Sequence, residues 1–194
     1  LQVRPLGTRA RGTPVALDAI DPGDVFVHSR AALGAGRDAT IRDIVAVRMD
    51  TFDRGRTGEV AEAVGQANAR LASEGRPYLL IGPGRWGTAD RWLGIPVRWA
   101  QIAGVRAIVE CGLGDFDVEP SQGTHFFHNL TSFGIPYFTV GRHVAGSVDW
   151  GWLAGLEPRA VLDHVILYRL DEPLEILVDG RTGEGVVLKP RAVA

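Results

Sequence analysis

Short apolar runs alternate with a helical pattern through the middle of this chain, and this alternation limits its fold more than any other feature. Tyr78 to Ile81, Ala107 to Val109 and Tyr137 to Val140 each predict a buried strand. Between residues 57 and 73, apolar side chains recur at helical spacing, with Thr57 as the expected N-cap. Two shorter helices are expected from Ile95 to Ala103 and from Gly123 to Phe133. The pattern indicates a mixed α/β domain built in layers.

The segments near both ends of the chain are predicted to form strands and little helix. Near the start, Asp24 to His28 and Thr40 to Val47 carry apolar runs among few turn residues. Near the other end, Asp179-Gly180 and Gly183 predict the tight turn of a hairpin. The strands expected around that turn are Val165 to Leu170, Leu174 to Val178 and Gly185 to Leu188.

Composition and charge narrow the classes of function. The chain has 194 residues, 45% of them hydrophobic, which is enough for a substantial core. Its 21 basic and 23 acidic residues give a formal net charge of −2, so we expect no nucleic-acid partner. The lone Cys111 cannot form an internal disulfide, and the sequence has no run of about 18 apolar residues that would span a bilayer. We therefore expect a cytoplasmic protein with no membrane partner.

A glycine-rich turn follows the first of the buried strands. Residues 82–87, Gly-Pro-Gly-Arg-Trp-Gly, satisfy the pattern G-x-G-x-x-G, and Glu110 ends a later strand 28 positions after the first glycine. A dinucleotide fingerprint requires a helix after the third glycine and an acidic residue about 20 positions on. Here Gly94-Ile95-Pro96 interrupts that helix. Three interpretations stay open: a nucleotide site, a turn in which Gly84 and Arg85 bind phosphate, and a purely structural turn.

The polar segment Ser121 to Asn129 carries two histidines at the start of a predicted helix. The dipole at a helix N-terminus favours negative charge and a neutral imidazole, which is the form that attacks phosphorus. We predict that His125 accepts a phosphoryl group that the amides of Gly123 and Thr124 and nearby arginines hold. A packed or capping histidine is the structural alternative. His128 is an alternative nucleophile or ligand, but the spacing fixes no third ligand, and we predict no metal.

The segment around His125 resembles the active-site segment of the phosphohistidine swivelling domain of phosphoenolpyruvate synthase and pyruvate phosphate dikinase. In this chain Gly123-Thr124-His125 is followed after eight residues by Gly134-Ile135-Pro136, and the family has Thr-Ser-His and Gly-Ile-Pro at the same distance. Gly104 to Glu110 looks like the strand that leads to the family's glycine-rich loop, and Leu174 to Leu188 looks like its closing hairpin. Leu1 to Leu6 resembles the last strand of the ATP-grasp domain that precedes the swivelling domain.

Tyr78 to Val140 also looks like the C-terminal part of bacterial phosphoenolpyruvate synthase-like proteins. The resemblance implies a layered β/β/α fold of the swivelling, phosphohistidine domain-like class over residues 7–194. It implies a remnant of the preceding ATP-grasp domain at residues 1–6. Residues 30–76 have no counterpart in the family that we can place, so we expect them to be an inserted helix region. The missing domains lead us to expect that the chain is part of a longer polypeptide.

The resemblance also implies a function. A phosphoryl group would pass from ATP to His125 and then toward pyruvate or a related acceptor, within an ATP-dependent phosphotransferase. The expected partner is the N-terminal ATP-grasp domain of the same polypeptide, where ATP and Mg²⁺ are expected to bind. The chain itself would hold no cofactor, and the isolated fragment is expected to be inactive.

One departure from the family keeps other functions open. Phe126-Phe127-His128-Asn129 stands where the family has small apolar residues. A degenerate, non-catalytic module that docks on the ATP-grasp domain and regulates it is therefore one alternative. The other is a small-molecule or nucleotide-binding α/β domain that uses Gly82 to Gly87.

Overall fold

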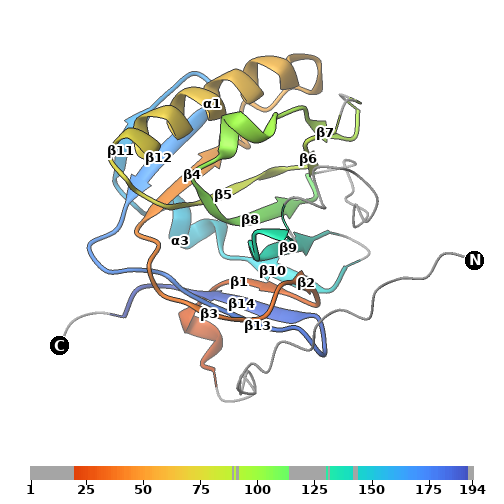
Figure 1. The fold of residues 1–194 in the computed structure, drawn as a ribbon, viewed down its shortest axis with the longest axis vertical. Coiled ribbons are helices and arrows are strands. Elements are labelled where there is room, and N and C mark those ends of the chain that lie inside the picture. The colour runs from red at the N-terminus through yellow and green to blue at the C-terminus, as the bar shows by residue number, and fades with distance from the viewer. Residues whose placement is uncertain are drawn as a thin grey trace, which may run out of the picture.

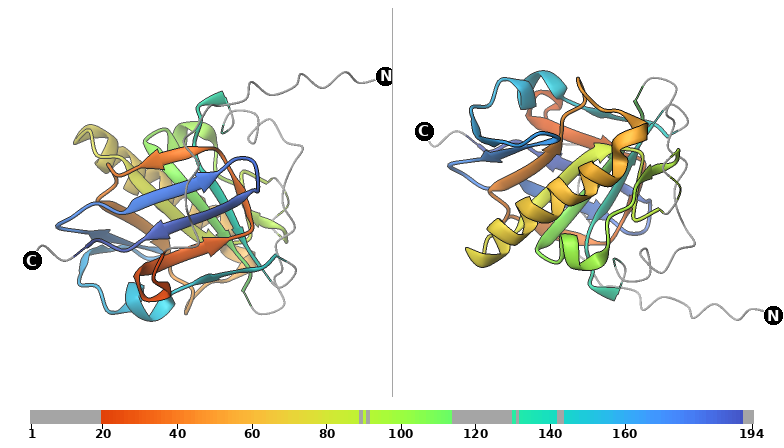
Figure 2. Two further views of the ribbon diagram at one scale, coloured as in Figure 1. Left: turned by 90° about the horizontal axis from the view of Figure 1, so that it is seen from below. Right: turned by 90° about the horizontal axis from the view of Figure 1, so that it is seen from above.

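Two β-sheets and one long helix are stacked in three layers (Figure 1). The structure is a computed structural model that describes residues 20–88, 90, 92–113, 130, 132–141 and 144–191. Helix α1 (Thr57–Ser73) covers one face of a seven-stranded sheet, and a five-stranded sheet packs on the other face (Figure 2). The predicted mixed α/β class is confirmed, with most of the regular structure in sheets.

The larger sheet has the strand order β11-β12-β4-β5-β8-β9-β2. Its four parallel strands are β4 (Asp43–Val47), β5 (Tyr78–Pro83), β8 (Val105–Cys111) and β9 (Tyr137–Val140). The antiparallel strands beside them are β11 (Pro158–Val161), β12 (Val165–Arg169) and β2 (Ala31–Leu33). Layers on both faces bury the parallel strands, which explains why they occur in the sequence as continuous apolar runs.

The smaller sheet is antiparallel throughout, in the order β10-β1-β14-β13-β3. Its strands are β10 (Gly146–Val148), β1 (Val25–Ser29), β14 (Glu184–Leu188), β13 (Glu175–Asp179) and β3 (Gly36–Asp38). The predicted hairpin near the C-terminus is confirmed as β13 and β14, and Gly183 in its turn has a φ of 72°. Only glycine adopts this left-handed conformation without strain.

Helix α1 has the bounds that the apolar spacing predicts, but the expected cap is wrong. Thr57 is buried and caps nothing; the N-cap position is Arg56, whose side chain makes no capping bond. A short 3₁₀ turn, η3 (Arg54–Arg56), runs directly into the helix, and the Asp53 side chain accepts a 2.7 Å hydrogen bond from Gly55 N–H at its start. In the described parts of the chain, no helix combines the length and apolar content needed to cross a bilayer.

The helix expected over Ile95 to Ala103 is wrong. Strand β7 (Gly94–Ile95) pairs with β6 (Arg85–Trp86), and only a 3₁₀ turn, η4 (Trp99–Ile102), follows. Pairing with the preceding turn therefore overrides the local helical signal. Most of the helix expected from Gly123 to Phe133 lies outside the described residues. The remaining elements are η2 (Pro22–Asp24) and α3 (Trp150–Ala154).

Residues 30–76, which the family resemblance marks as an insertion, take part in all three layers. They contribute β2 and β4 to the larger sheet, β3 to the smaller sheet, and α1. Residues 1–6, expected as a remnant of another domain, lie outside the described residues.

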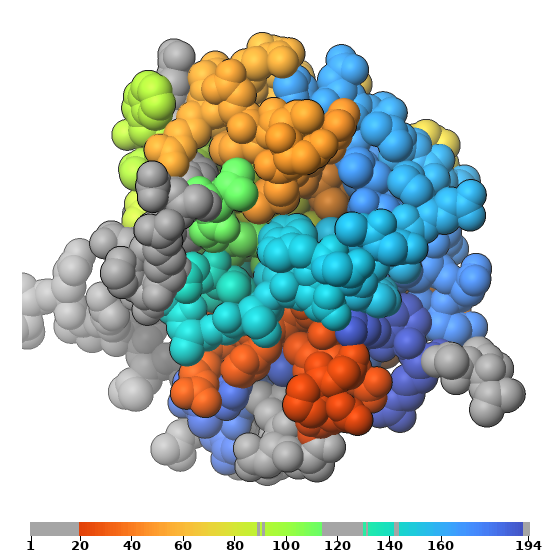
Figure 3. Space-filling model, turned by 180° about the vertical axis from the view of Figure 1, so that it is seen from behind, coloured from red at the N-terminus to blue at the C-terminus, as the bar shows by residue number. Residues whose placement is uncertain are grey.

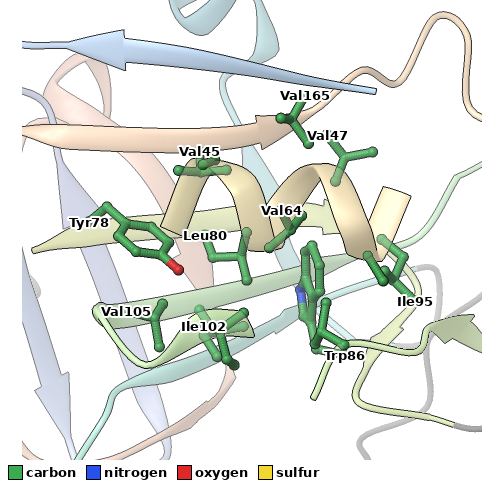
Figure 4. Packing of buried hydrophobic residues seen from close by; sticks show 14 of the residues in the cluster. Val45, Val47, Val64, Tyr78, Leu80, Trp86, Ile95, Ile102, Val105 and Val165 are labelled. Carbon is green, nitrogen blue, oxygen red and sulfur yellow. The ribbon is translucent and has the colours of Figure 1, made fainter. Parts of the chain in front are cut away.

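Two apolar cores separate the layers. Between α1 and the larger sheet, Val64 of the helix packs over residues of the parallel strands (Figure 4). Trp86 and Ile95 lie at the same end of this cluster as Val47, the last residue of β4, and Tyr78 lies at the opposite end. The second core lies between the sheets and contains the side chains of alternate residues of the same strands. The parallel strands are therefore held rigidly on both faces, which fixes the groups at their ends.

Candidate functional site

The carboxyl ends of β5, β8 and β9 meet at one edge of the larger sheet, where ligands bind in open α/β sheets. The glycine-rich turn follows β5, and Glu110 is the penultimate residue of β8. The predicted nucleophile belongs to the connection that leaves β8 at this edge and returns to β9. Its residues Gly123, Thr124, His125 and His128 lie outside the described residues.

Glu110 is fully buried and accepts hydrogen bonds from two hydroxyl groups. The Tyr137 hydroxyl donates to Oε2, and Thr139 Oγ1 donates to Oε1 at 2.8 Å. Burial raises the pKa of Glu110 to about 7, although both donors and the nearby Arg85 guanidinium act in the opposite direction. This carboxyl group therefore changes its charge near neutral pH.

The parallel register explains why these three groups meet. Thr139 stands opposite Glu110 in the β8–β9 ladder, and Tyr137 stands opposite Ile108, two residues before the glutamate. Residues two apart on a strand share a face, so all three side chains lie on the α1 side of the sheet. Sequence reasoning found Glu110 only as the acidic residue of a nucleotide pattern and missed both hydroxyl groups. A glutamate inside an apolar strand was the available signal, because such a carboxyl group needs buried donors.

The glycine-rich turn folds back over the end of β5. A Cβ atom at Gly82 would lie 2.6 Å from Val47 Cγ2 and 2.8 Å from the Trp86 ring, so only glycine fits there. The Trp86 ring is buried in this position, and its Nε1–H donates a 3.2 Å hydrogen bond to the Val109 carbonyl. Gly84 has a φ of 72°, which turns the chain. Gly87 has a φ of 74°, so packing accounts for Gly82 and a left-handed backbone accounts for Gly84 and Gly87.

The backbone amides of this turn donate to the protein itself. Gly84 N–H donates to Cys111 O, and Arg85 N–H donates to Leu93 O, both at 2.9 Å. Phosphate-binding loops instead point such amides at the ligand. The next described element after the turn is strand β7, where a dinucleotide fingerprint has a helix. The predicted role of Gly84 in binding phosphate requires its backbone amide, but that amide already donates to Cys111 O. The half-buried Arg85 side chain is the cationic group of the turn, and it acts on Glu110.

A cavity of about 450 Å³ opens on the other face of the same edge. Cys111 and Gly112 line it from β8, Val140 from β9 and Trp150 from α3. Burial raises the pKa of the Cys111 thiol, which disfavours the thiolate form that acts as a nucleophile. The cavity lies beside the point where the connection containing His125 leaves β8.

Among the described residues, no three His, Cys, Asp or Glu side chains are grouped so as to hold a metal ion. His128, the alternative ligand, lies outside that part of the chain. Comparison with known proteins gives no assignment either: no family model, no curated protein and no solved structure matches this chain.

Proposed function

We propose that this chain is a phosphohistidine-type carrier module in which His125 accepts a phosphoryl group. The observation that supports this most is the position of the cation Arg85. It follows β5 at the edge from which the connection containing His125 departs, beside the ends of β8 and β9. A guanidinium group recognises phosphoryl oxygens through paired hydrogen bonds, so this edge suits an incoming phosphate.

The layer order supports the finer fold assignment that goes with this function. A five-stranded sheet, a seven-stranded sheet and a helical layer give the order β/β/α that the swivelling class of carrier domains has. A carrier of this kind must move between two active sites as a rigid body. The cores on both faces of the larger sheet provide that rigidity.

The proposed chemistry consists of two displacements at phosphorus. An imidazole nitrogen of His125 attacks, the new N–P bond forms as a P–O bond of ATP breaks, and the nucleotide leaves with that oxygen. An oxygen of the acceptor then attacks the same phosphorus, and the N–P bond breaks. ATP and its Mg²⁺ would be bound by an ATP-grasp domain, and a pyruvate-class acceptor by another domain, so this chain supplies only the carrier.

The test follows phosphorus in the full gene product, because the donor site belongs to another domain. The protein is incubated with ATP labelled at the β or the γ phosphorus and then denatured. We expect label that is lost in acid and kept in alkali, absent from His125→Ala and present in His128→Ala. Arg85→Gln should slow the labelling. A wild-type protein that takes up no label would exclude the carrier function. A label that is lost in His128→Ala and kept in His125→Ala would show that His128 is the phosphorylated residue.

A non-catalytic docking module is the second candidate, and one observation favours it. Trp92 and Leu93, in the loop between β6 and β7, leave 61% and 43% of their surfaces exposed. Adjacent large apolar residues at the surface are typical of protein contacts. If this function is right, a separately produced ATP-grasp domain binds the chain in calorimetry, and the double substitution Trp92→Ser with Leu93→Ser weakens binding while no phosphohistidine forms.

A further inference from the structure

The outer face of the smaller sheet holds a pocket of about 360 Å³. None of Glu110, Tyr137 and Thr139 lines it. Its polar lining consists of His28, Ser147, Asp149 and Glu184, and its apolar lining includes Val25 and Val186. Three adjacent strands, β10, β1 and β14, supply most of these residues. Figure 3 shows the surface where the first described residues meet the last strand and the α3 region. β10 is an edge strand, so Ser147 also borders the 450 Å³ cavity.

A serine, a histidine and a glutamate stand in a row across these strands. His28 lies directly opposite Ser147 in the β1–β10 ladder and opposite Val186 in the β1–β14 ladder. Directly opposed residues of antiparallel strands share a face, with Cβ atoms about 5 Å apart. Glu184, two residues before Val186, lies on that face too, and its Oε1 is 2.8 Å from His28 Nε2.

We propose that Ser147 is a nucleophile that the His28–Glu184 pair activates toward small carboxylic esters. The carboxylate holds the imidazole through Nε2, which leaves Nδ1 as the nitrogen nearer the backbone and the opposed serine. Ser147 is exposed, so its side chain can rotate about χ1, and the proposal requires the rotamer that turns its hydroxyl toward that nitrogen. Nucleophile, base and orienting carboxylate are the three parts of a hydrolytic triad, which is recognised by geometry and not by order in the sequence.

The surroundings favour this role for Glu184 over Asp149, the other carboxylate of the pocket. Asp149 is already engaged, because Oδ2 pairs with Lys189 at 2.8 Å and Oδ1 accepts from Trp152 N–H at 2.9 Å. Glu184 Oε1 lies 2.8 Å from His28 Nε2. Arg30 Nε lies 3.9 Å from the same Oε1 atom, which adds positive charge beside the carboxylate. Val25 and Val186 form an apolar wall suited to a short acyl chain.

The reaction balances with water as the only co-reactant. Ser147 Oγ attacks the acyl carbon and passes its proton to His28. The ester C–O bond breaks, and the alcohol leaves with that proton. Water, which gives a proton to the same imidazole, then attacks the acyl-serine. The C–O bond to Ser147 breaks, the carboxylic acid leaves, and Ser147 regains a proton.

The chain contains a matched control in a second imidazole–carboxylate pair. His164 Nε2 lies 3.3 Å from Glu59 Oε2, and the histidine sits in the turn before β12, outside the strand ladders. His164→Gln therefore removes a similar pair without touching the proposed nucleophile. Ser73→Ala removes another exposed serine, whose hydroxyl only donates to Arg70 O.

The experiment uses a fluorophosphonate probe and p-nitrophenyl acetate with the whole chain. We expect one probe molecule per chain, bonded to Ser147 with loss of fluoride, and hydrolysis that falls about 100-fold in Ser147→Ala and His28→Gln. Glu184→Gln should lower the rate less, and His164→Gln and Ser73→Ala should leave it unchanged. Circular dichroism shows whether each variant is folded. Ser147 is exposed, so Ser147→Ala should stay folded, and this variant decides the result if His28→Gln unfolds. A wild-type protein that takes no probe, or a Ser147→Ala variant that still takes it, would overturn the proposal.

Discussion

The Thr139 hydroxyl on β9 donates a 2.8 Å hydrogen bond to Glu110 on β8, and the two residues stand directly opposite in a parallel ladder. Both residues are fully buried, so the carboxyl group is shielded from the solvent that would stabilise its charge. Its two hydroxyl donors offset only part of that cost, as the direction of its pKa shift shows. The charge of this site is therefore coupled to the stability of the fold.

The first prediction concerns the pH dependence of stability. The pKa of Glu110 is about 7 in the folded protein and 4.5 when exposed, so between these values the folded state binds more protons. The contribution of Glu110 is thus fully present below pH 4.5 and is lost as the pH rises through 7, by about 3 kcal/mol. Urea titrations at pH 5 and pH 8 should show most of this loss in the wild type and not in Glu110→Gln. Parallel curves for the two proteins would contradict it.

The second prediction isolates one donor. Tyr137→Phe removes a hydrogen bond to a carboxyl group that is charged at pH 8 and neutral at pH 5. We expect it to lower the free energy of unfolding by about 2 kcal/mol at pH 8 and by about 1 kcal/mol at pH 5. Tyr78→Phe is the control, because that buried hydroxyl donates to the neutral amide oxygen of Asn68 at 3.1 Å. Its cost should be the same at both pH values.

Local signals in the sequence predict much of this fold. Helix α1 and the buried strands follow from residue spacing, because neighbours in the chain decide which face of an element is apolar. The helix expected over Ile95 to Ala103 fails for a tertiary reason. A Cβ atom at Gly94 would lie 1.9 Å from Arg85 O, so the chain must pass close to an earlier turn. No local sequence pattern indicates that Gly94 lies against the backbone of Arg85.

The candidate sites could be predicted only in part, because strand partners join distant residues. The end of an apolar strand marks Glu110 in the sequence, but Tyr137 and Thr139 reach it only through the pairing of β8 with β9. His28 and Glu184 are 156 positions apart and meet because β1 pairs with β14. The sequence contains these residues without showing which strands are neighbours.

The third prediction tests whether packing requires the first glycine of the turn. Gly82→Ala places a methyl group against Val47 and the Trp86 ring, both in the buried cluster, and should cost about 1 to 3 kcal/mol of stability. Gly58→Ala is the control, since nothing lies within 4 Å of its added Cβ in α1. That substitution should stabilise the protein by about 0.5 to 1 kcal/mol. Thermal melts of both variants check the contrast, and equal melting temperatures would rule out the packing role.

The last prediction concerns Asp43, a buried carboxylate at the start of β4 that binds two arginines. Arg76 Nε donates to its Oδ2 at 3.0 Å, and Arg169 Nη1 donates to the same oxygen from β12. Asp43→Ala leaves the mostly buried Arg76 without its main partner, so we expect a loss of about 3 to 5 kcal/mol. Glu172→Ala breaks a more exposed ion pair with Arg42 and should cost less than about 1 kcal/mol. Chemical denaturation measures both losses. A small effect of Asp43→Ala would mean that Arg76 finds water or Glu74 instead.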